Sequence, residues 1–273
     1  MSVGQDVHAA ATTVKHSPVL EALARIGFIG YGFTHLLVAW LAVRIAAGQP
    51  APAGDQSGAL RTLVDGPGGR PLVWAICVGF VAMTIWQALE AAVGHWSETG
   101  GRRTVERLLS AGRVVFYGYL GYTAWTVATG SPKTSADSQQ TTSAGMLDSE
   151  PGRWTVMVIG IAVLCLGAGL IWYGLTRQFE RHLRTGEMAA GAQHVARWLG
   201  IVGYVAKGAA YGIAGLLLFN AARSFDPSKA RGLDATLRTL AGQPFGRTLL
   251  VVVAVGIGSF AAFCIIQARY RKV

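Results

Sequence analysis

Long apolar runs separated by short polar segments dominate the pattern of this chain. Runs that carry no charge, apart from Lys207 in the fifth, predict six membrane spans. They are Ile26–Val43, Pro71–Leu89, Val114–Pro132, Trp154–Thr176, Trp198–Ala222 and Thr248–Ala268. Each approaches or exceeds the roughly 20 residues that a helix needs to cross a bilayer. The pattern therefore predicts an all-α polytopic membrane protein and disfavours a soluble helical bundle.

The chain also repeats itself. Leu-Arg-Thr-Leu occurs at 60–63 and 237–240, and Pro-x-Gly-Arg follows at 67–70 and 244–247, both at an offset of 177 residues. Gly-x-x-Gly-Tyr occurs at 27–31 and 200–204, and a fainter middle copy has Gly118-Tyr119 and then Gly152-Arg153. A repeat unit with two spans enters the membrane the same way in every copy. The sequence therefore predicts three tandem helical hairpins with pseudo-threefold symmetry about an axis along the membrane normal.

These repeats set the predicted organisation of the chain. It consists of a cytoplasmic N-terminal tail at 1–22, a first repeat at 23–93, a divergent second repeat at 107–177 and a third repeat at 197–270. The first and third repeats carry leucines at helical spacing between their spans, after Ser57 and Asp234, which are placed where an N-cap belongs. We predict a short interfacial helix at each of these places, and a polar loop at 131–150 in the second repeat.

The quoted motifs resemble those of the domain-of-unknown-function family 1206, integral-membrane proteins common in high-GC bacteria. The resemblance covers nearly all of the segment from Leu23 to Tyr270, and the middle copy is the most divergent. It implies an architecture built from pairs of spans. The family supplies no catalytic residues, so the resemblance implies no activity.

Composition and charge agree with a membrane location. Only 14% of the residues are charged, whereas a soluble domain carries about a quarter. The net charge of +10 would suggest nucleic acid as the partner of a soluble protein. Here most basic residues flank the spans, where they anchor helices at lipid headgroups. We therefore expect the lipid bilayer as partner and no nucleic acid, while a membrane-protein partner or a homo-oligomer stays open.

The distribution of Lys and Arg predicts the orientation. Thirteen of the twenty-four lie on the side that holds both termini, ten lie on the other side, and Lys207 lies within a span. Because basic residues accumulate on the cytoplasmic side, we expect a bacterial inner-membrane protein with both termini in the cytoplasm.

Few polar side chains lie inside the predicted spans, and the repeats relate most of them. Aligning Tyr31, Tyr119 and Tyr204 brings Thr34, Tyr122 and Lys207 to one repeat position, with His35 at the next. Residues at i, i+3 and i+4 share a helix face, so three polar stripes would face one another across the axis. Glu90, at the edge of the second span, is a candidate ion-pair partner for Lys207. The candidate interior polar site is therefore Lys207, His35, Thr34, Tyr31, Tyr119, Tyr122, Tyr204 and Glu90.

Two functions are compatible with such an interior. In the first, which we favour, the protein is an accessory or structural membrane component whose polar side chains satisfy one another. In the second, it is a small-solute or ion transporter or channel that uses a central site around Lys207 and His35. The chain has no Cys-x-x-Cys, His-Glu-x-x-His or phosphate-loop motif, so we expect neither an enzyme nor a cofactor or metal site.

Overall fold

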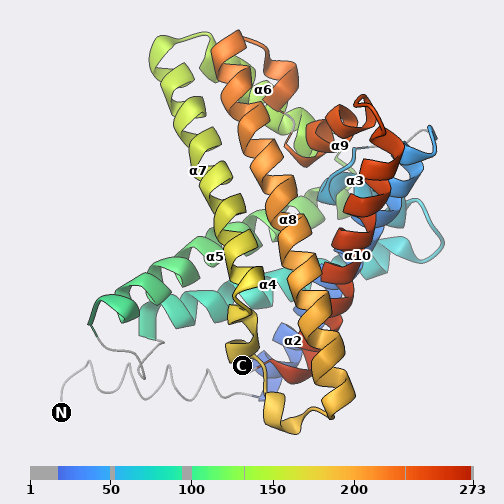
Figure 1. The fold of residues 1–273 in the computed structure, drawn as a ribbon, viewed down its shortest axis with the longest axis vertical. Helices are drawn as coiled ribbons and strands as arrows, with labels where there is room; N and C mark the ends of the chain where they lie inside the picture. Colours follow the sequence, from blue (N-terminus) through green and yellow to red (C-terminus); the bar gives the residue numbers. More distant parts are fainter. Residues whose placement is uncertain (1–17, 50–52, 94–99, 132, 231, 272–273) are drawn as a thin grey trace.

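The computed structural model describes residues 18–49, 53–93, 100–131, 133–230 and 232–271. The predicted N-terminal tail lies outside the described residues up to position 17, and residues 18–22 form the start of the first helix. The regular elements of the described part are all helices, apart from one isolated bridge between Leu183 and Arg271. Its elements (Figure 1) are α2 (Pro18–Ala46), α3 (Gln56–Val64), α4 (Gly69–Val93), α5 (Gly100–Ala128), α6 (Ser135–Leu147), α7 (Glu150–Leu175), η1 (Gln178–His182), η2 (Thr185–Glu187), α8 (Ala190–Ser224), η3 (Pro227–Ala230), α9 (Leu233–Ala241) and α10 (Gly246–Tyr270).

Five of these helices are long and apolar enough to cross a membrane. The candidate spans are Arg25–Ala46, Gly69–Ala92, Glu150–Leu175, Ala190–Ser224 and Gly246–Tyr270. The predicted third span, Val114–Pro132, ends earlier than expected, because α5 stops at Ala128. The first half of α5 carries four arginines and a glutamate, and its apolar half is shorter than a full span requires.

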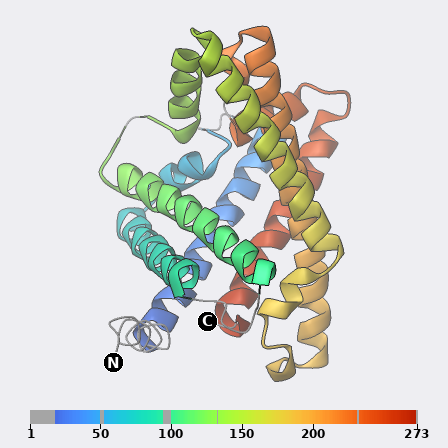
Figure 2. The same ribbon diagram turned by 90° about the vertical axis from the view of Figure 1, so that its left-hand side faces the viewer.

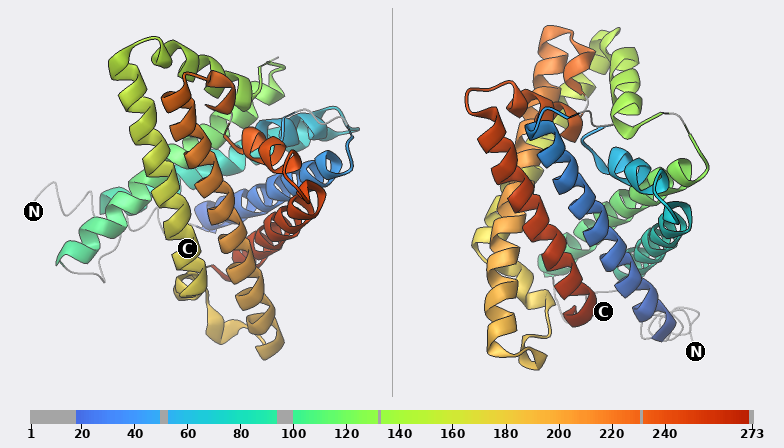
Figure 3. Two further views of the ribbon diagram at one scale, coloured as in Figure 1. Left: turned by 45° about the horizontal axis from the view of Figure 1, so that its top comes forward. Right: turned by 90° about the vertical axis from the view of Figure 1, so that its right-hand side faces the viewer.

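The long helices pack in a recurring order. The most extensive contacts join α4 to α5, α7 to α8, and α10 to α2. Figures 2 and 3 show α4 beside α5 and α10 beside α2. Each of these contacts connects the second long helix of one sequence repeat to the first long helix of the next. Within repeats, α2 packs on α4 and α8 packs on α10, whereas α5 and α7 make no comparable contact among the described residues.

Glycines allow the closest of these helix contacts. A Cβ atom added to Gly167 of α7 would lie 2.6 Å from the carbonyl oxygen of Gly208 and 2.6 Å from the amide nitrogen of Gly212, both on α8. A Cβ atom on Gly27 of α2 would lie 2.7 Å from the carbonyl oxygen of Gly79 on α4. Small residues at such crossings let helix backbones approach, which is a common basis of helix association in membranes.

Three short helices, α3, α6 and α9, lie toward the end of the bundle opposite to that where α2 begins and α10 ends (Figures 1 and 2). We call them the lid helices. The short helices predicted for the first and third repeats are confirmed by α3 and α9. The segment 131–150, expected as a loop, instead contains α6. Thr134 begins this helix with a capping box to Asp137, in which each residue bonds the backbone of the other.

The N-cap predictions were wrong by two residues in both copies. Asp55 caps α3 by accepting from the backbone N–H of Gly58, while Ser57 donates its hydroxyl to Asp55 and accepts from the backbone N–H of Ser135 at the start of α6. The cap of α9 is Gly232, which has no side chain to bond. The two polar residues at the predicted sites instead connect different parts of the lid.

The buried carboxyl group of Asp55 makes the lid sensitive to pH. Burial raises its pKa above the ordinary value, the nearby Asp234 raises it further, and hydrogen bonds from Ser57 and Gly58 offset part of this effect. For an acid whose folded-state pKa is raised, the stabilising contribution is complete below the unfolded-state pKa and is lost as pH rises through the folded-state pKa. We therefore expect Asp55→Asn, which keeps a good N-cap, to have a melting temperature in detergent that falls less than that of the wild type between about pH 4 and 7.

Asp226→Asn is the control for this pH experiment. Asp226 lies in the exposed turn at η3, and hydrogen bonds, chiefly from Ser228, lower its pKa. Its contribution to stability therefore has the opposite sign and is lost as pH falls. A difference in melting temperature between wild type and Asp55→Asn that stays constant with pH would contradict the assignment.

Candidate functional site

The ammonium group of Lys207, midway along α8, is surrounded by aromatic side chains from four helices. Its Nζ donates a hydrogen bond to the hydroxyl oxygen of Tyr31 on α2. It lies 4.2 Å from the ring centroid of Phe260, 4.8 Å from that of Tyr31, 5.6 Å from that of Phe116 and 5.7 Å from that of Tyr211. Aromatic faces at these distances attract a cation, and the attraction is stronger where water is excluded. The rings therefore replace part of the hydration that Lys207 loses within the bilayer.

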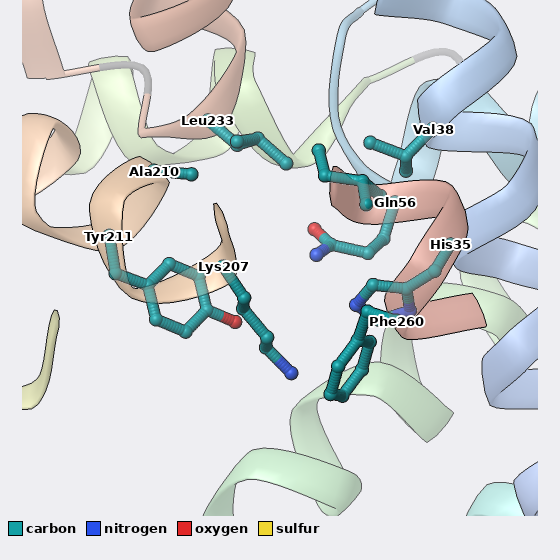
Figure 4. Close-up of a pocket in the computed structure, with 9 residues that line it drawn as sticks. His35, Val38, Gln56, Lys207, Ala210, Tyr211, Leu233 and Phe260 are labelled. Atoms are coloured by element: carbon teal, nitrogen blue, oxygen red, sulfur yellow. The ribbon is translucent and has the colours of Figure 1, made fainter. Parts of the chain in front are cut away.

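A cavity of about 20 Å³ lies beside this cluster. Its lining includes His35, Gln56, Lys207 and Tyr211. Figure 4 shows the amide of Gln56, from lid helix α3, pointing toward the ring of His35, while Lys207 extends below them toward Phe260. The volume holds about one water molecule. This cavity is therefore too small for a solute larger than water.

Two of the predicted polar residues are satisfied by their own helix. His35 lies 4% exposed, and its Nδ1 donates to the carbonyl oxygen of Tyr31 at 2.9 Å. Because a carbonyl oxygen can only accept, the proton of the neutral imidazole lies on Nδ1. Thr34 is fully buried and donates its hydroxyl to the carbonyl oxygen of Gly30 at 2.8 Å. Thr34 therefore makes no bond to Lys207, although it precedes His35 on the same helix.

Tyr31 and Tyr204 belong to one continuous aromatic core. The ring centroid of Tyr31 lies 5.9 Å from that of Phe260, and the ring of Tyr204 lies 5.3 Å from the same phenylalanine. Both contacts are edge-to-face, a favourable geometry for aromatic pairs. Tyr204 also contacts Tyr173 at 4.9 Å and stacks on Phe179 at 5.7 Å. Tyr31 of the first repeat and Tyr204 of the third repeat thus both pack against Phe260 of the third repeat.

The second repeat was placed in the wrong register. Tyr119 and Tyr122, predicted to face the axis, are 42% and 62% exposed. The hydroxyl of Tyr119 is 3.5 Å from the side-chain amide nitrogen of Gln139 on lid helix α6. The side chain that reaches the core is Tyr117, whose ring centroid lies 5.9 Å from that of Tyr31. The shift is two residues, and it turns the predicted stripe of α5 toward the outside.

Glu90 is not the partner of Lys207. It lies three residues before the end of α4, on the side where the chain enters α2. Among the described residues, no carboxylate forms an ion pair with Lys207, whose polar contact is the hydroxyl of Tyr31. The predicted site is therefore partly assembled: the structure joins Lys207, Tyr31 and His35, and it leaves Glu90, Tyr119 and Tyr122 apart.

Several residues of the cluster were missed by sequence reasoning. Phe116, Phe260 and Tyr211 resemble ordinary apolar positions of a span, and Gln56 lies in a lid helix distant in sequence from the spans it covers. The sequence did not distinguish the two registers of α5. Tyr31 has glycine on both sides, so it matches Tyr117 before Gly118 as well as Tyr119 after it.

Comparisons with known proteins identify the family. The family described as Domain of Unknown Function (DUF1206) matches three segments, residues 26–94, 110–177 and 202–271. The chain is 28% identical over 258 residues to the uncharacterized protein YxxB of Bacillus subtilis (strain 168), an alignment that covers 93% of this chain and 92% of that protein. No solved structure matches. The chain therefore belongs to this family, which confirms the resemblance inferred from its motifs.

Proposed function

Starting from membership of a family whose function is unknown, we propose that this protein is a non-catalytic accessory component of the bacterial cytoplasmic membrane. In this proposal the cluster around Lys207 is structural: its aromatic rings pack the repeats together and accommodate the ammonium group without using it. The observation that carries it is the enclosure of the ammonium group by four aromatic rings and one hydroxyl. A cavity of about 20 Å³ supports a closed interior more than a conduction path.

We further propose that α5 crosses the membrane as a sixth span and that the three repeats surround a common axis. The cyclic order of contacts supports this arrangement, because α4–α5, α7–α8 and α10–α2 each join consecutive repeats. The excess of Lys and Arg at the end that holds the termini supports a cytoplasmic location for that end. The lid helices would then face the opposite side.

Transport is the second candidate, and one observation favours it. Lys207 is a charged residue near the middle of a helix long enough to span the bilayer, and an intramembrane charge costs at least about 2.5 kcal/mol on the mildest scale. Proteins commonly retain such residues for ion or solute pathways. The same charge is accounted for here by its aromatic and hydroxyl contacts, so we rank transport second.

The substitution Lys207→Met tests the structural proposal. Methionine has a similar length and no charge, and replacing a buried charge by an apolar group is often neutral or stabilising by about 1–4 kcal/mol. We expect the variant to fold and to melt in detergent at the temperature of the wild type or above it. We also expect wild-type proteoliposomes to pass chloride, potassium and protons no faster than protein-free liposomes.

Lys229→Met provides the matched control, because Lys229 lies in η3 and its side chain is 39% exposed. Its melting temperature should stay unchanged. The transport function would replace the structural one if wild-type proteoliposomes showed a flux above the liposome background, and if Lys207→Met and His35→Ala both folded and abolished it.

A further inference from the structure

A second group of charged and aromatic side chains lies at the end of the bundle opposite to the lid helices, near the C-terminal ends of α7 and α10. The phenol of Tyr173, close to the end of α7, interacts electrostatically with Arg271, Arg113, Glu106 and Arg181. These residues come from the segment after α10, from α5 and from η1. Three positive charges and one negative charge give this region a net positive charge. It is distinct from the Lys207 cluster, and its location at the membrane surface rests on the proposed span in α5.

Two buried nitrogen donors that lie on neighbouring side chains at this end have no hydrogen-bond partner among the described residues. They are Nε of Arg271 and Nε1 of Trp86, and Trp86 is only 4% exposed. The guanidinium carbon of Arg271 lies 5.4 Å from the ring centroid of Trp86 and 4.9 Å from that of Phe28. Buried N–H groups are almost always paired. Unpaired donors beside a guanidinium that forms no ion pair with the described residues indicate a missing ligand with acceptor oxygens.

The position of these residues along their helices matches the level of lipid headgroups. Arg113 is the last charged residue of α5 before its apolar half, which begins at Val114. Tyr173 lies two residues before the end of α7, and Arg271 follows directly after α10. Each of the three helices therefore changes from apolar to polar sequence close to one of these residues. Arginines and tyrosines at such a boundary are typical contacts of phospholipid headgroups.

Among the described residues, α5 and α7 make no contact comparable to those between α2 and α4 or between α8 and α10, so the second repeat is not closely packed at this place. Arg113 and Arg271 both interact electrostatically with Tyr117 of α5, and Tyr117 interacts with Tyr173 of α7. Exposed apolar side chains lie close in sequence to Tyr117 and Tyr173: Val115 is 73% exposed and Trp172 is 65% exposed. A phosphate at the arginines would therefore have apolar surface for two acyl chains directly beside it.

We propose that Arg113, Arg271 and Trp86 form a headgroup site for an anionic phospholipid, bound between α5 and α7. The phosphate oxygens would accept from the two guanidinium groups and from the indole N–H, as expected for charge-assisted hydrogen bonds. A zwitterionic headgroup fits less well, because its ammonium group would lie among arginines. The lipid would occupy the place where the second repeat lacks the helix contact that the other two repeats have.

The test uses the full chain, purified in detergent and depleted of lipid. Phosphatidylglycerol is added, with phosphatidylethanolamine and inorganic phosphate as separate probes, and binding is followed by native mass spectrometry and by the melting temperature. We expect phosphatidylglycerol to bind and to raise the melting temperature, and the double variant Arg113→Gln/Arg271→Gln to bind it at least about tenfold more weakly. Arg269→Gln is the matched control, since Arg269 is exposed and lies two residues from Arg271.

Each other outcome decides against the proposal. Equal binding of phosphatidylglycerol by the wild type and the double variant would show that the two arginines do not bind the lipid. An equal stabilisation by inorganic phosphate would show a site for free phosphate, and equal binding of phosphatidylethanolamine would show a surface without charge preference. If the double variant does not fold, Trp86→Phe and Arg113→Gln are measured singly; both should weaken binding, and unchanged binding in both would overturn the assignment.

Discussion

Replacing Gly167 by valine should separate α7 from α8 and cause the largest loss of stability that we predict. Any Cβ atom at this position would lie 2.6 Å from two backbone atoms of α8, the Gly208 oxygen and the Gly212 nitrogen. Backbone atoms cannot move away without moving the whole helix. Overpacking of this kind costs about 1–3 kcal/mol, and the two further methyl groups place valine at the upper end of that range. We expect a fall in melting temperature of roughly 6–12 °C in detergent, because about 1 kcal/mol corresponds to 2–4 °C at this chain length.

Gly169→Val separates this packing effect from the change in helix propensity. Gly169 lies two residues further along α7, and a Cβ atom there would meet nothing within 4 Å. Both substitutions replace glycine by valine in the same helix, so their intrinsic effect on the helix is the same. The control should melt at or slightly above the temperature of the wild type. Equal losses in the two variants would show that α7 and α8 do not pack as described.

The spans and the repeats could be predicted from the sequence because both depend on local patterns. An apolar run of sufficient length must be helical in a bilayer, where every backbone polar group needs an internal partner. The repeated segment at 60–70 and 237–247 was informative for the same reason: its leucine spacing and its closing proline indicate a short helix whatever lies around it. The structure has α3 and α9 at these places.

The register of the second repeat could not be decided in this way. Tyr117 and Tyr119 stand on either side of Gly118, so two alignments place a tyrosine at the repeat position. The face that α5 turns inward is set by its contact with α4, where the Cys77 thiol reaches the Gly121 carbonyl oxygen at 3.5 Å and a Cβ on Gly121 would lie 3.6 Å from Phe80. That contact is tertiary, and no local pattern of α5 contains it.

The arginine site was missed for a related reason. Arg113, Arg271 and Trp86 come from three different helical segments, and each has an ordinary explanation in isolation. An arginine at the end of a span anchors the helix, and a tryptophan in a span is apolar. Only the folded arrangement places the Arg271 guanidinium against the Trp86 ring, with Nε of Arg271 and Nε1 of Trp86 both lacking an acceptor among the described residues. The polar interior was easier to predict, because a lysine within an apolar span can be recognised from the sequence without knowing which residues surround it.

The substitution Asp234→Ala should detach the third lid helix from the rest of the lid. Asp234 is fully buried, and its Oδ1 accepts from the backbone N–H of Gly54 at 2.8 Å and from Nε of Arg238 at 2.9 Å. The first of these bonds links residues 180 positions apart. Alanine would leave the Gly54 N–H buried without this acceptor and would remove a carboxylate from Arg238. Together these losses should cost about 2–4 kcal/mol.

Asp234→Asn and Asp226→Ala make this prediction specific. Asparagine keeps an oxygen for the Gly54 N–H and loses the charge next to Arg238, so its stability should lie between those of the wild type and the alanine variant. Asp226 also pairs with a basic residue, Lys229 at 3.5 Å, but its side chain is 40% exposed, and exposed pairs contribute at most about 1 kcal/mol. Amide hydrogen exchange gives the local readout: α9 should exchange faster in Asp234→Ala, while α7 and α8 keep their protection. Asp226→Ala could instead lower the melting temperature as much as Asp234→Ala does. In that case the burial of Asp234 would not explain the loss of stability, and the hydrogen bond between α9 and the segment before α3 would not hold the lid helices together.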